Sequence, residues 1–320
     1  MNQHEISEQA VSPPVDVSGM PTDGSSSATR GRAVLAPQGS NGSCSCSSGA
    51  GTDVMQAGTS AYPYVYAIGQ IDVRFPGLTL EKEFAQATGR AETAGLSDRQ
   101  ALQAALSDER NRYLARQLCW VLMIEGVDTY IVGPRDPTNY DVLLETVRPV
   151  PNRGADTDVV IGLRGPIAPA EACNGLMIPI VAFDQIYSFD TAALLGAIPR
   201  PENVSEEEFR PRAQELFNRI VQVADNAGAT DEHRALNYLA TRYPDIYVRT
   251  SDAFAQNYEL AQVDVQPSRL SGSRRIVTVI FTYNQRGGVA GFFSEQFFVR
   301  VDVTEEFPFL VSPLQKGFIR

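Results

Sequence analysis

The chain has 320 residues, of which 43% are apolar, and it carries a formal net charge of −11 with a sequence pI near 4.8. This length and apolar content allow one large domain or two ordinary ones with a proper core. The acidic balance argues against a nucleic-acid binder and against a protein held on anionic lipid. No apolar run approaches the roughly 18 residues of a membrane span, and the N-terminus lacks the features of a signal peptide. The sequence therefore predicts a soluble, cytoplasmic protein.

Residues 1 to about 60 are rich in Ser, Gly and Pro and contain no aromatic residue. Such a segment buries too little apolar surface to offset its ordering entropy, so we expect a disordered tail. Within it, Cys44-Ser45-Cys46 can place two thiolates on one soft metal ion. A chance pair of exposed thiols is the alternative interpretation.

The first ordered elements are expected after Tyr62-Pro63. Residues 65–75 have the pattern of a strand that ends at Pro76-Gly77. Residues 80–88 predict a short helix, and Ser97 is placed to cap a second one. The segment 112–124 is ambiguous, and we favour a helix that gives way to a hairpin with a strand at 129–132.

The middle of the chain mixes both kinds of element. Residues 139–147 predict a helix, and residues 158–165 predict a strand that enters a glycine turn. No Gly-Lys-Ser/Thr follows, so this turn is not a phosphate loop. Residues 177–187 predict another strand, and Pro179 indicates that it lies at a sheet edge or a bulge.

Two helices and a group of strands are expected in the last third. Residues 205–227 predict a long helix that starts at a Ser205 cap and is closed by Gly228. Residues 230–243 predict a second helix that ends at Pro244. After Pro244 the pattern changes to alternating strands, at 261–266, 275–283 and 297–303, which suggests an antiparallel meander. The expected fold class is α+β, with a mixed or antiparallel sheet and several packed helices behind the tail.

Cysteine and histidine provide the candidate metal ligands. Four cysteines in so long a chain are not a disulfide scaffold, so in a reducing compartment we expect free thiols or metal ligands. Cys119 lies in the most apolar part of the chain and is best explained as a core residue. His233 falls in the first turn of its helix, where the helix dipole favours a neutral ring that can ligate a metal. A ring hydrogen-bonded by nearby side chains is the simpler alternative.

Several runs carry a resemblance to a known family. They are Tyr64–Ile71, Leu80–Thr93, Tyr113–Leu122, Pro166–Pro169 with Cys173–Met177, Ala229–Tyr238 and Phe298–Phe309. Together these runs resemble the C-terminal domain of the PatG and PatA cyanobactin maturation proteins, over residues of about 62 to 310. The segment around Cys44 and Cys46 is similar to cysteine-containing linkers that precede this domain. The resemblance implies two parts, a Ser/Gly-rich tail at 1–60 and an α+β domain at 61–320.

The resemblance also implies a place in the biosynthesis of ribosomally made, modified peptides. In that family a separate subtilisin-like domain performs the protease and macrocyclase chemistry. The sequence runs of that domain are missing here, so we do not expect this activity from the chain. We expect a non-catalytic accessory protein that binds the precursor peptide or a peptide-modifying enzyme, with a homodimer as a further expectation.

Two alternatives involve the cysteines. A metal-assisted enzyme that modifies a precursor peptide would use Cys44, Cys46, Cys173 and His233 as ligands, with Asp231 or Glu232 as base or supporting partner. A structural zinc on the same four residues would accompany the accessory role without any chemistry, with Cys119 as the reserve ligand. The tail could also be a substrate-like peptide, although its flanks resemble a linker more closely.

Overall fold

The computed structural model describes residues 64–90, 98–148, 156–202, 204–223, 225–268, 272–287 and 294–317. The chain divides into residues 1–55 and 56–320, and all described residues lie in the second unit. The predicted tail, together with Cys44 and Cys46, falls outside the described residues.

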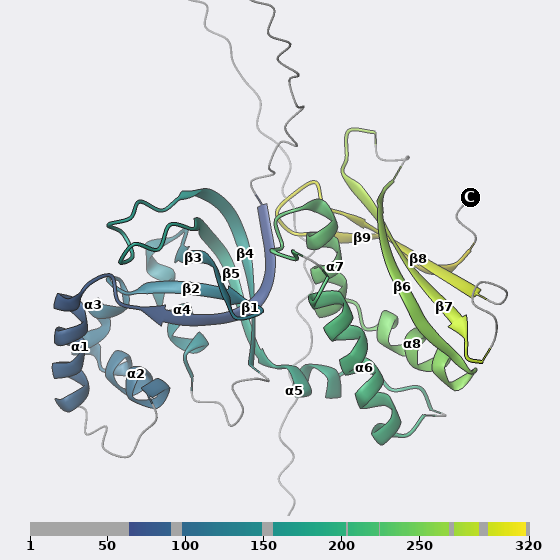
Figure 1. Cartoon of the computed structure of the whole chain (residues 1–320), viewed down its shortest axis with the longest axis horizontal. Helices are drawn as coiled ribbons and strands as arrows, with labels where there is room; N and C mark the ends of the chain where they lie inside the picture. The colour runs from purple at the N-terminus through teal and green to yellow at the C-terminus, as the bar shows by residue number, and fades with distance from the viewer. Residues whose placement is uncertain are drawn as a thin grey trace, which may run out of the picture. The chain divides into compact units, whose positions relative to one another are not determined.

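The first sheet is a closed barrel (Figure 1). Its strands are β1 (Tyr64–Arg74), β2 (Cys119–Ile124), β3 (Val127–Pro134), β4 (Asp156–Ile167) and β5 (Pro179–Asp190). They follow the order β1-β2-β3-β5-β4, and β1 pairs with β4 to close the ring. All neighbours are antiparallel except β3 and β5, which are parallel. A barrel closed in this way has no sheet edge.

Short helices connect the barrel strands along the chain. They are α1 (Leu78–Arg90), α2 (Asp98–Ser107), a 3₁₀ turn at Glu109–Asn111, α3 (Arg112–Ala115), a 3₁₀ turn at Pro137–Asn139 and α4 (Tyr140–Thr146). Their apolar residues join one core with the barrel, and Trp120 at its centre is 1% exposed. The helix-to-hairpin interpretation of residues 112–124 is confirmed, because α3 ends at Ala115 and β2 begins at Cys119.

The second sheet is open and antiparallel. Its strands, in spatial order, are β6 (Tyr258–Pro267), β7 (Ile276–Gln285), β8 (Ser294–Asp302) and β9 (Phe309–Lys316). The helices α5 (Thr191–Gly196), α6 (Glu206–Val221), α7 (Asp231–Arg242) and α8 (Asp245–Ala255) precede it. Every second residue of β7, from Val277 to Tyr283, packs into a core shared with these helices. Residues of β1 and β4 join the same core, so α7 packs between the barrel wall and the open sheet.

The α+β fold class is confirmed, with helices beside a mixed sheet and an antiparallel one. Among the described residues, no helix is long and apolar enough to cross a membrane. The helix caps agree with the sequence, since the Ser205 and Thr230 side chains accept the backbone N–H groups of Glu208 and His233.

Several expectations were wrong. Helix α7 ends at Arg242, before Pro244, as expected, but strands do not follow directly. Helix α8 occupies Asp245–Ala255, and the first strand of the second sheet begins only at Tyr258. Helix α6 ends at Val221, well before Ala227. Gly228 instead has a φ of +69° and lies so close to Tyr66 that a Cβ would meet the Tyr66 carbonyl oxygen at 2.4 Å. Strand β5 is not at an edge, since β3 and β4 flank it. The β4–β5 register shifts between Arg164 and Ile167, beside the pair of Ile167 with Pro179, so the bulge alternative is confirmed.

Candidate functional site: an open strand edge

The second sheet has two outer strands, β6 and β9, and they differ in how much backbone they leave unpaired. An outer strand presents a row of N–H and C=O groups that can pair with another chain. Which of these groups are free follows from the register of each strand and from the side chains around it.

The backbone of β6 faces outward at alternate residues. The Ser268 N–H donates to the Ile276 carbonyl at 2.7 Å, so this residue pair is hydrogen-bonded across the strands. Hydrogen-bonded pairs recur at every second residue of an antiparallel ladder. Gln262, Asp264 and Gln266 therefore bond to β7, and the N–H and C=O groups of Val263 and Val265 face away from it. No described residue pairs with these four groups.

Both ends of this outward row are limited. At one end, Arg219 of α6 donates to the Leu260 carbonyl oxygen at 2.5 Å, and the register shifts between Leu260 and Gln262. At the other end, Pro267 has no N–H to offer. The open part of the edge is therefore the short segment Val263–Val265.

The opposite edge, on β9, is closed by two tyrosines of the α7 region. The Leu314 N–H donates to the Tyr243 hydroxyl oxygen at 2.9 Å. The Leu310 backbone is hydrogen-bonded to the Tyr238 hydroxyl. Pro313 lies between them and cannot donate. The outward N–H groups of Leu310 and Leu314 are therefore covered, in contrast to those of Val263 and Val265 on β6.

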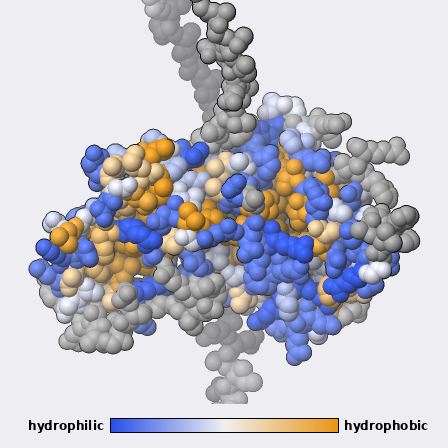
Figure 2. Space-filling view, in the orientation of Figure 1, coloured by the Kyte–Doolittle hydropathy of each residue, from blue (hydrophilic) through white to orange (hydrophobic). Residues whose placement is uncertain are grey.

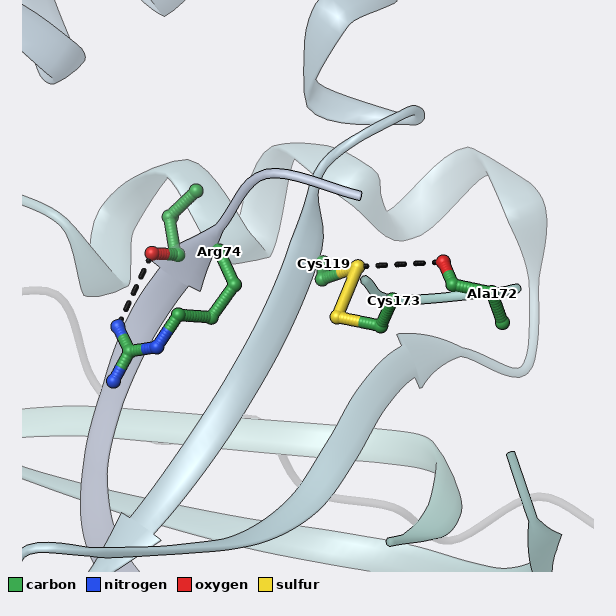
Figure 3. The surroundings of a disulfide bond; sticks show 5 residues. Arg74, Cys119, Ala172 and Cys173 are labelled. Atoms are coloured by element: carbon green, nitrogen blue, oxygen red, sulfur yellow. Dashed lines mark hydrogen bonds between the residues drawn. A yellow bond between two sulfur atoms is a disulfide. The ribbon is translucent and has the colours of Figure 1, made fainter. Parts of the chain in front are cut away.

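Cys173, one of the predicted metal ligands, lies elsewhere in the fold. It forms a disulfide with Cys119 of β2, with the two Cα atoms 5.9 Å apart (Figure 3). The bond ties the loop between β4 and β5 to the outer face of the barrel, where Val121, Met123 and Leu176 pack around it. The expectation of free thiols is wrong for this pair. Because a disulfide sulfur carries no thiolate, Cys173 can bind a metal only after reduction.

His233 lies in the first turn of α7, as expected, where its N–H donates to the Thr230 hydroxyl oxygen at 3.2 Å. Burial lowers the pKa of its imidazole, and Glu232 and Asp225 oppose that effect. Burial therefore favours the neutral form of the ring. Its Nδ1 atom is buried and has no hydrogen-bond partner among the described residues.

The described residues do not gather His233 into a metal site. No group of three or more His, Cys, Asp and Glu side chains within them could hold an ion. Asp231, the proposed base, is paired with Arg275 at 3.0 Å and with Arg234 at 3.6 Å. Because Cys44 and Cys46 lie outside the described residues, the four-ligand zinc site stays a prediction.

Two hollows of about 500 and 610 Å³ flank the junction of β1 and α1, and both are lined by Phe75 and Glu81. Arg74 lines the larger one and is paired with Asp72 at 2.8 Å and Asp128 at 3.1 Å. These charged groups satisfy one another, which is typical of a structural cluster.

A buried carboxyl in the barrel, Asp158, has a shifted pKa but also has partners. Burial raises its pKa to about 6. One carboxylate oxygen accepts the Ile71 N–H at 2.6 Å, and the other accepts the Ser188 hydroxyl. Because each oxygen already has a partner, Asp158 is explained by its role in joining β1, β4 and β5.

A family model matches the part of the chain that contains both edges. A family model described as PatG C-terminal matches residues 203–316, which run from before α6 to the last residue of β9. This chain carries a PatG C-terminal-type domain. The comparison with curated proteins finds no match.

A solved structure titled "PatG Domain of Unknown Function" has the same fold, with a TM-score of 0.64 and 23% sequence identity. The superposition covers 80% of this chain and 98% of that chain. The fold likeness therefore extends beyond the PatG C-terminal-type domain at 203–316 and into the barrel.

Only the strand of this site, and not its open edge, could be predicted from the sequence. The alternation of residues 261–266 predicts the strand itself, but strand order and register decide which backbone groups are free. The tyrosines that close β9 lie on a distant helix, and no local pattern in Phe309–Lys316 indicates them. Within the PatG C-terminal-type domain, the open edge could be found only from the fold.

Proposed function

We propose that this chain is a non-catalytic accessory protein of modified-peptide biosynthesis that binds an extended peptide along β6. The peptide would be the precursor peptide or a segment of a peptide-modifying enzyme. The observation that carries the proposal is the outward row of unpaired N–H and C=O groups at Val263 and Val265. Addition of a strand to a free edge is a common way to recognise a peptide. The pathway itself rests on the PatG C-terminal-type domain and the resemblance to cyanobactin maturation proteins.

The edge sets limits on affinity and ligand charge. Each new backbone hydrogen bond contributes a net ~0.5–1.5 kcal/mol, so a few such bonds support weak binding unless side chains add contacts. The chain has a net charge of −11, which favours a neutral or basic peptide over an acidic one.

The test uses an edge variant and a matched control in the full chain. Val265→Pro removes an outward N–H without removing a ladder bond, and proline is tolerated at such edge positions. Val265→Thr keeps the N–H and the branched side chain. The probe is a fluorescent ten-residue peptide of alternating Val and Thr with two Lys residues, followed by anisotropy.

We expect Val265→Thr to bind the probe like the wild type and Val265→Pro to bind it at least about fivefold more weakly, the loss of roughly one hydrogen bond. In hydrogen exchange, the probe should slow the amides of Val263 and Val265. Equal binding by both variants would contradict the proposal, as would a bound probe that leaves these amides unchanged. A dimer that slows the same amides without peptide would show that a second copy of β6 occupies the edge.

A zinc site on Cys44, Cys46, Cys173 and His233 is our second proposal, supported by the buried and unpartnered Nδ1 of His233. It would be structural, or catalytic if one coordination position stays open to the peptide. Zinc content per chain, measured under reducing conditions, should be about one and should fall in His233→Ala and in Cys44→Ser/Cys46→Ser. Absence of zinc from the reduced wild type would contradict this proposal.

A further inference from the structure

We propose that the arginine-lined pocket at the start of β6 binds the terminal carboxylate of the peptide that pairs with β6. This inference rests on the proposed function, because it names the end of the peptide and the residues that recognise it. Three observations carry it: an open cavity, an arginine without an ionic partner, and the direction of the strand.

The cavity has a volume of about 90 Å³ and lies where α6, α8 and β6 meet. Its lining includes Arg212 and Arg219 from α6, Phe254 from α8, Tyr258 from the start of β6, and Arg286 from the turn after β7. Space of this size holds a few water molecules or one carboxylate group. Figure 2 shows mostly hydrophilic surface over the region of α6 and α8.

Two of the arginines stack on one aromatic ring. The guanidinium carbons of Arg212 and Arg286 lie 3.5 Å and 3.4 Å from the centre of the Phe254 ring. Two such groups at these distances can only occupy opposite faces of the ring. Stacking on both faces of one ring restrains the positions of the two guanidinium groups.

The charges around the pocket are unevenly compensated. Glu215 and Glu259 also line the pocket. Arg219 pairs with Glu215 at 3.0 Å, and Arg286 lies 3.7 Å from Glu259. Arg212 forms no ion pair with any described residue, and its Nη1 atom is buried without a hydrogen-bond partner.

Burial lowers the pKa of Arg212, and the positive charge of Arg286 lowers it further against the opposing effect of Glu208. A buried donor without a partner is costly. An anion beside Arg212 would supply both the missing acceptor and the missing charge, and a carboxylate matches the guanidinium fork.

The direction of β6 indicates which carboxylate. A peptide that pairs antiparallel with β6 runs toward the start of the strand, so its C-terminal end lies beside Tyr258 to Leu260, which line the pocket. The open groups at Val263 lie about three residues, or roughly 10 Å, from Leu260. A peptide that pairs there therefore reaches the pocket with its last residues.

The first experiment tests the pocket without the strand edge. N-acetylglycine and N-acetylglycinamide have the same backbone, but only the first carries a terminal carboxylate. Each is added to the full chain, and the side-chain N–H signals of its arginines are followed by NMR. Arg212→Gln is the variant, and Arg210→Gln is the control, because Arg210 is exposed on the same helix and, within the described part of the chain, forms an ion pair with Glu206 alone.

We expect saturable shifts with N-acetylglycine in the wild type and in Arg210→Gln, and none with the amide or in Arg212→Gln. If Arg212→Gln fails to fold, the comparison of acid and amide in the wild type still decides the question. Equal shifts with acid and amide would overturn the inference. Inorganic phosphate that competes more strongly than N-acetylglycine would overturn the assignment to a chain end.

The second experiment separates this inference from the proposed function. The ten-residue probe is compared with its C-terminal amide. In the wild type, we expect the amide to bind roughly ten- to hundredfold more weakly than the acid, which is the range for a charge-assisted hydrogen bond. In Arg212→Gln, we expect acid and amide to bind with the same weak affinity. If acid and amide bind equally and Val265→Pro weakens both, the pocket is wrong and the strand edge stands. If N-acetylglycine shifts Arg212 but no probe binds β6, the peptide-binding function is wrong and the pocket binds carboxylates on its own.

Discussion

The two sheets of this chain leave different amounts of backbone unpaired. The barrel closes β1 onto β4, so each of its strands has a neighbour on both sides. The second sheet ends at β6 and β9. The hydroxyls of Tyr238 and Tyr243 cover two N–H groups of β9. On β6, Arg219 covers the Leu260 carbonyl oxygen, and the backbone groups of Val263 and Val265 stay open. Natural sheets usually protect their edges against unwanted pairing. The open segment of β6 therefore supports the proposed binding of a peptide at this edge.

The largest expected effect concerns Arg234, which holds the connection between β8 and β9. Its side chain is fully buried and donates to the carbonyl oxygens of Val303 at 2.7 Å, Glu306 at 3.1 Å and Glu305. Arg234→Met should lower the free energy of unfolding by about 3–5 kcal/mol, since several buried acceptors lose their donor. Urea unfolding measures this. Arg210→Met, at an exposed pair, is the control and should change stability by less than about 1 kcal/mol. Similar values for both would contradict the role given to Arg234.

The disulfide gives the next effect, and it lies in the barrel. Cys119 and Cys173 are 54 positions apart, so their bond restricts a long loop of the unfolded chain. Cys119→Ser/Cys173→Ser should lower the free energy of unfolding by about 2–4 kcal/mol. Wild type unfolded in the presence of a thiol reductant should match the variant. If the reductant has no effect on the wild type, the two cysteines are not bonded in the purified protein.

A pH effect is expected where β5 meets the β8–β9 connection. Burial, together with the neighbouring Asp184 carboxyl, raises the pKa of Glu306 to about 7 against the opposing charges of Arg135 and Arg234. A carboxyl whose pKa is raised on folding stabilises the fold at low pH and loses that contribution as the pH rises through the folded value. The wild type should therefore lose stability between about pH 4.5 and 7, relative to Glu306→Gln, which keeps a neutral group. A constant difference between the two proteins over this range would contradict the shifted pKa.

The smallest effect comes from opening the protected edge. Tyr243→Phe removes the acceptor of the Leu314 N–H and should cost about 1 kcal/mol, the net value of one hydrogen bond. The Leu314 amide should then exchange faster with solvent, toward the behaviour expected of β6. Unchanged exchange at Leu314 would mean that the tyrosine does not protect this edge.

Most elements of the fold could be predicted from the sequence, and the errors have physical reasons. The stripe of α6 and its Ser205 cap are local signals, and that helix was found, though its end was placed too late. Helix α8 was missed because Ile246, Tyr247 and Val248 favour strands locally and are held in a helix by tertiary packing.

The candidate site was less accessible to sequence reasoning. Arg212 and Arg286, which both stack on the Phe254 ring, are about seventy positions apart in the sequence. No sequence motif predicts that they meet. The pairing of Cys119 with Cys173 likewise depends on how the β4–β5 loop crosses β2. Composition and the expected compartment favoured free thiols. This expectation failed for Cys119 and Cys173 because neither property reports which residues meet in the fold.

The most direct test of the open edge is amide hydrogen exchange in the full chain without any ligand. The amides of Val263 and Val265 face outward from β6, whereas those of Leu310 and Leu314 are covered by Tyr238 and Tyr243. We predict that the first two exchange much faster than the last two under the same conditions. If the amides of Val263 and Val265 are as protected as those of Leu310 and Leu314, the β6 edge is already occupied. That result would contradict the account.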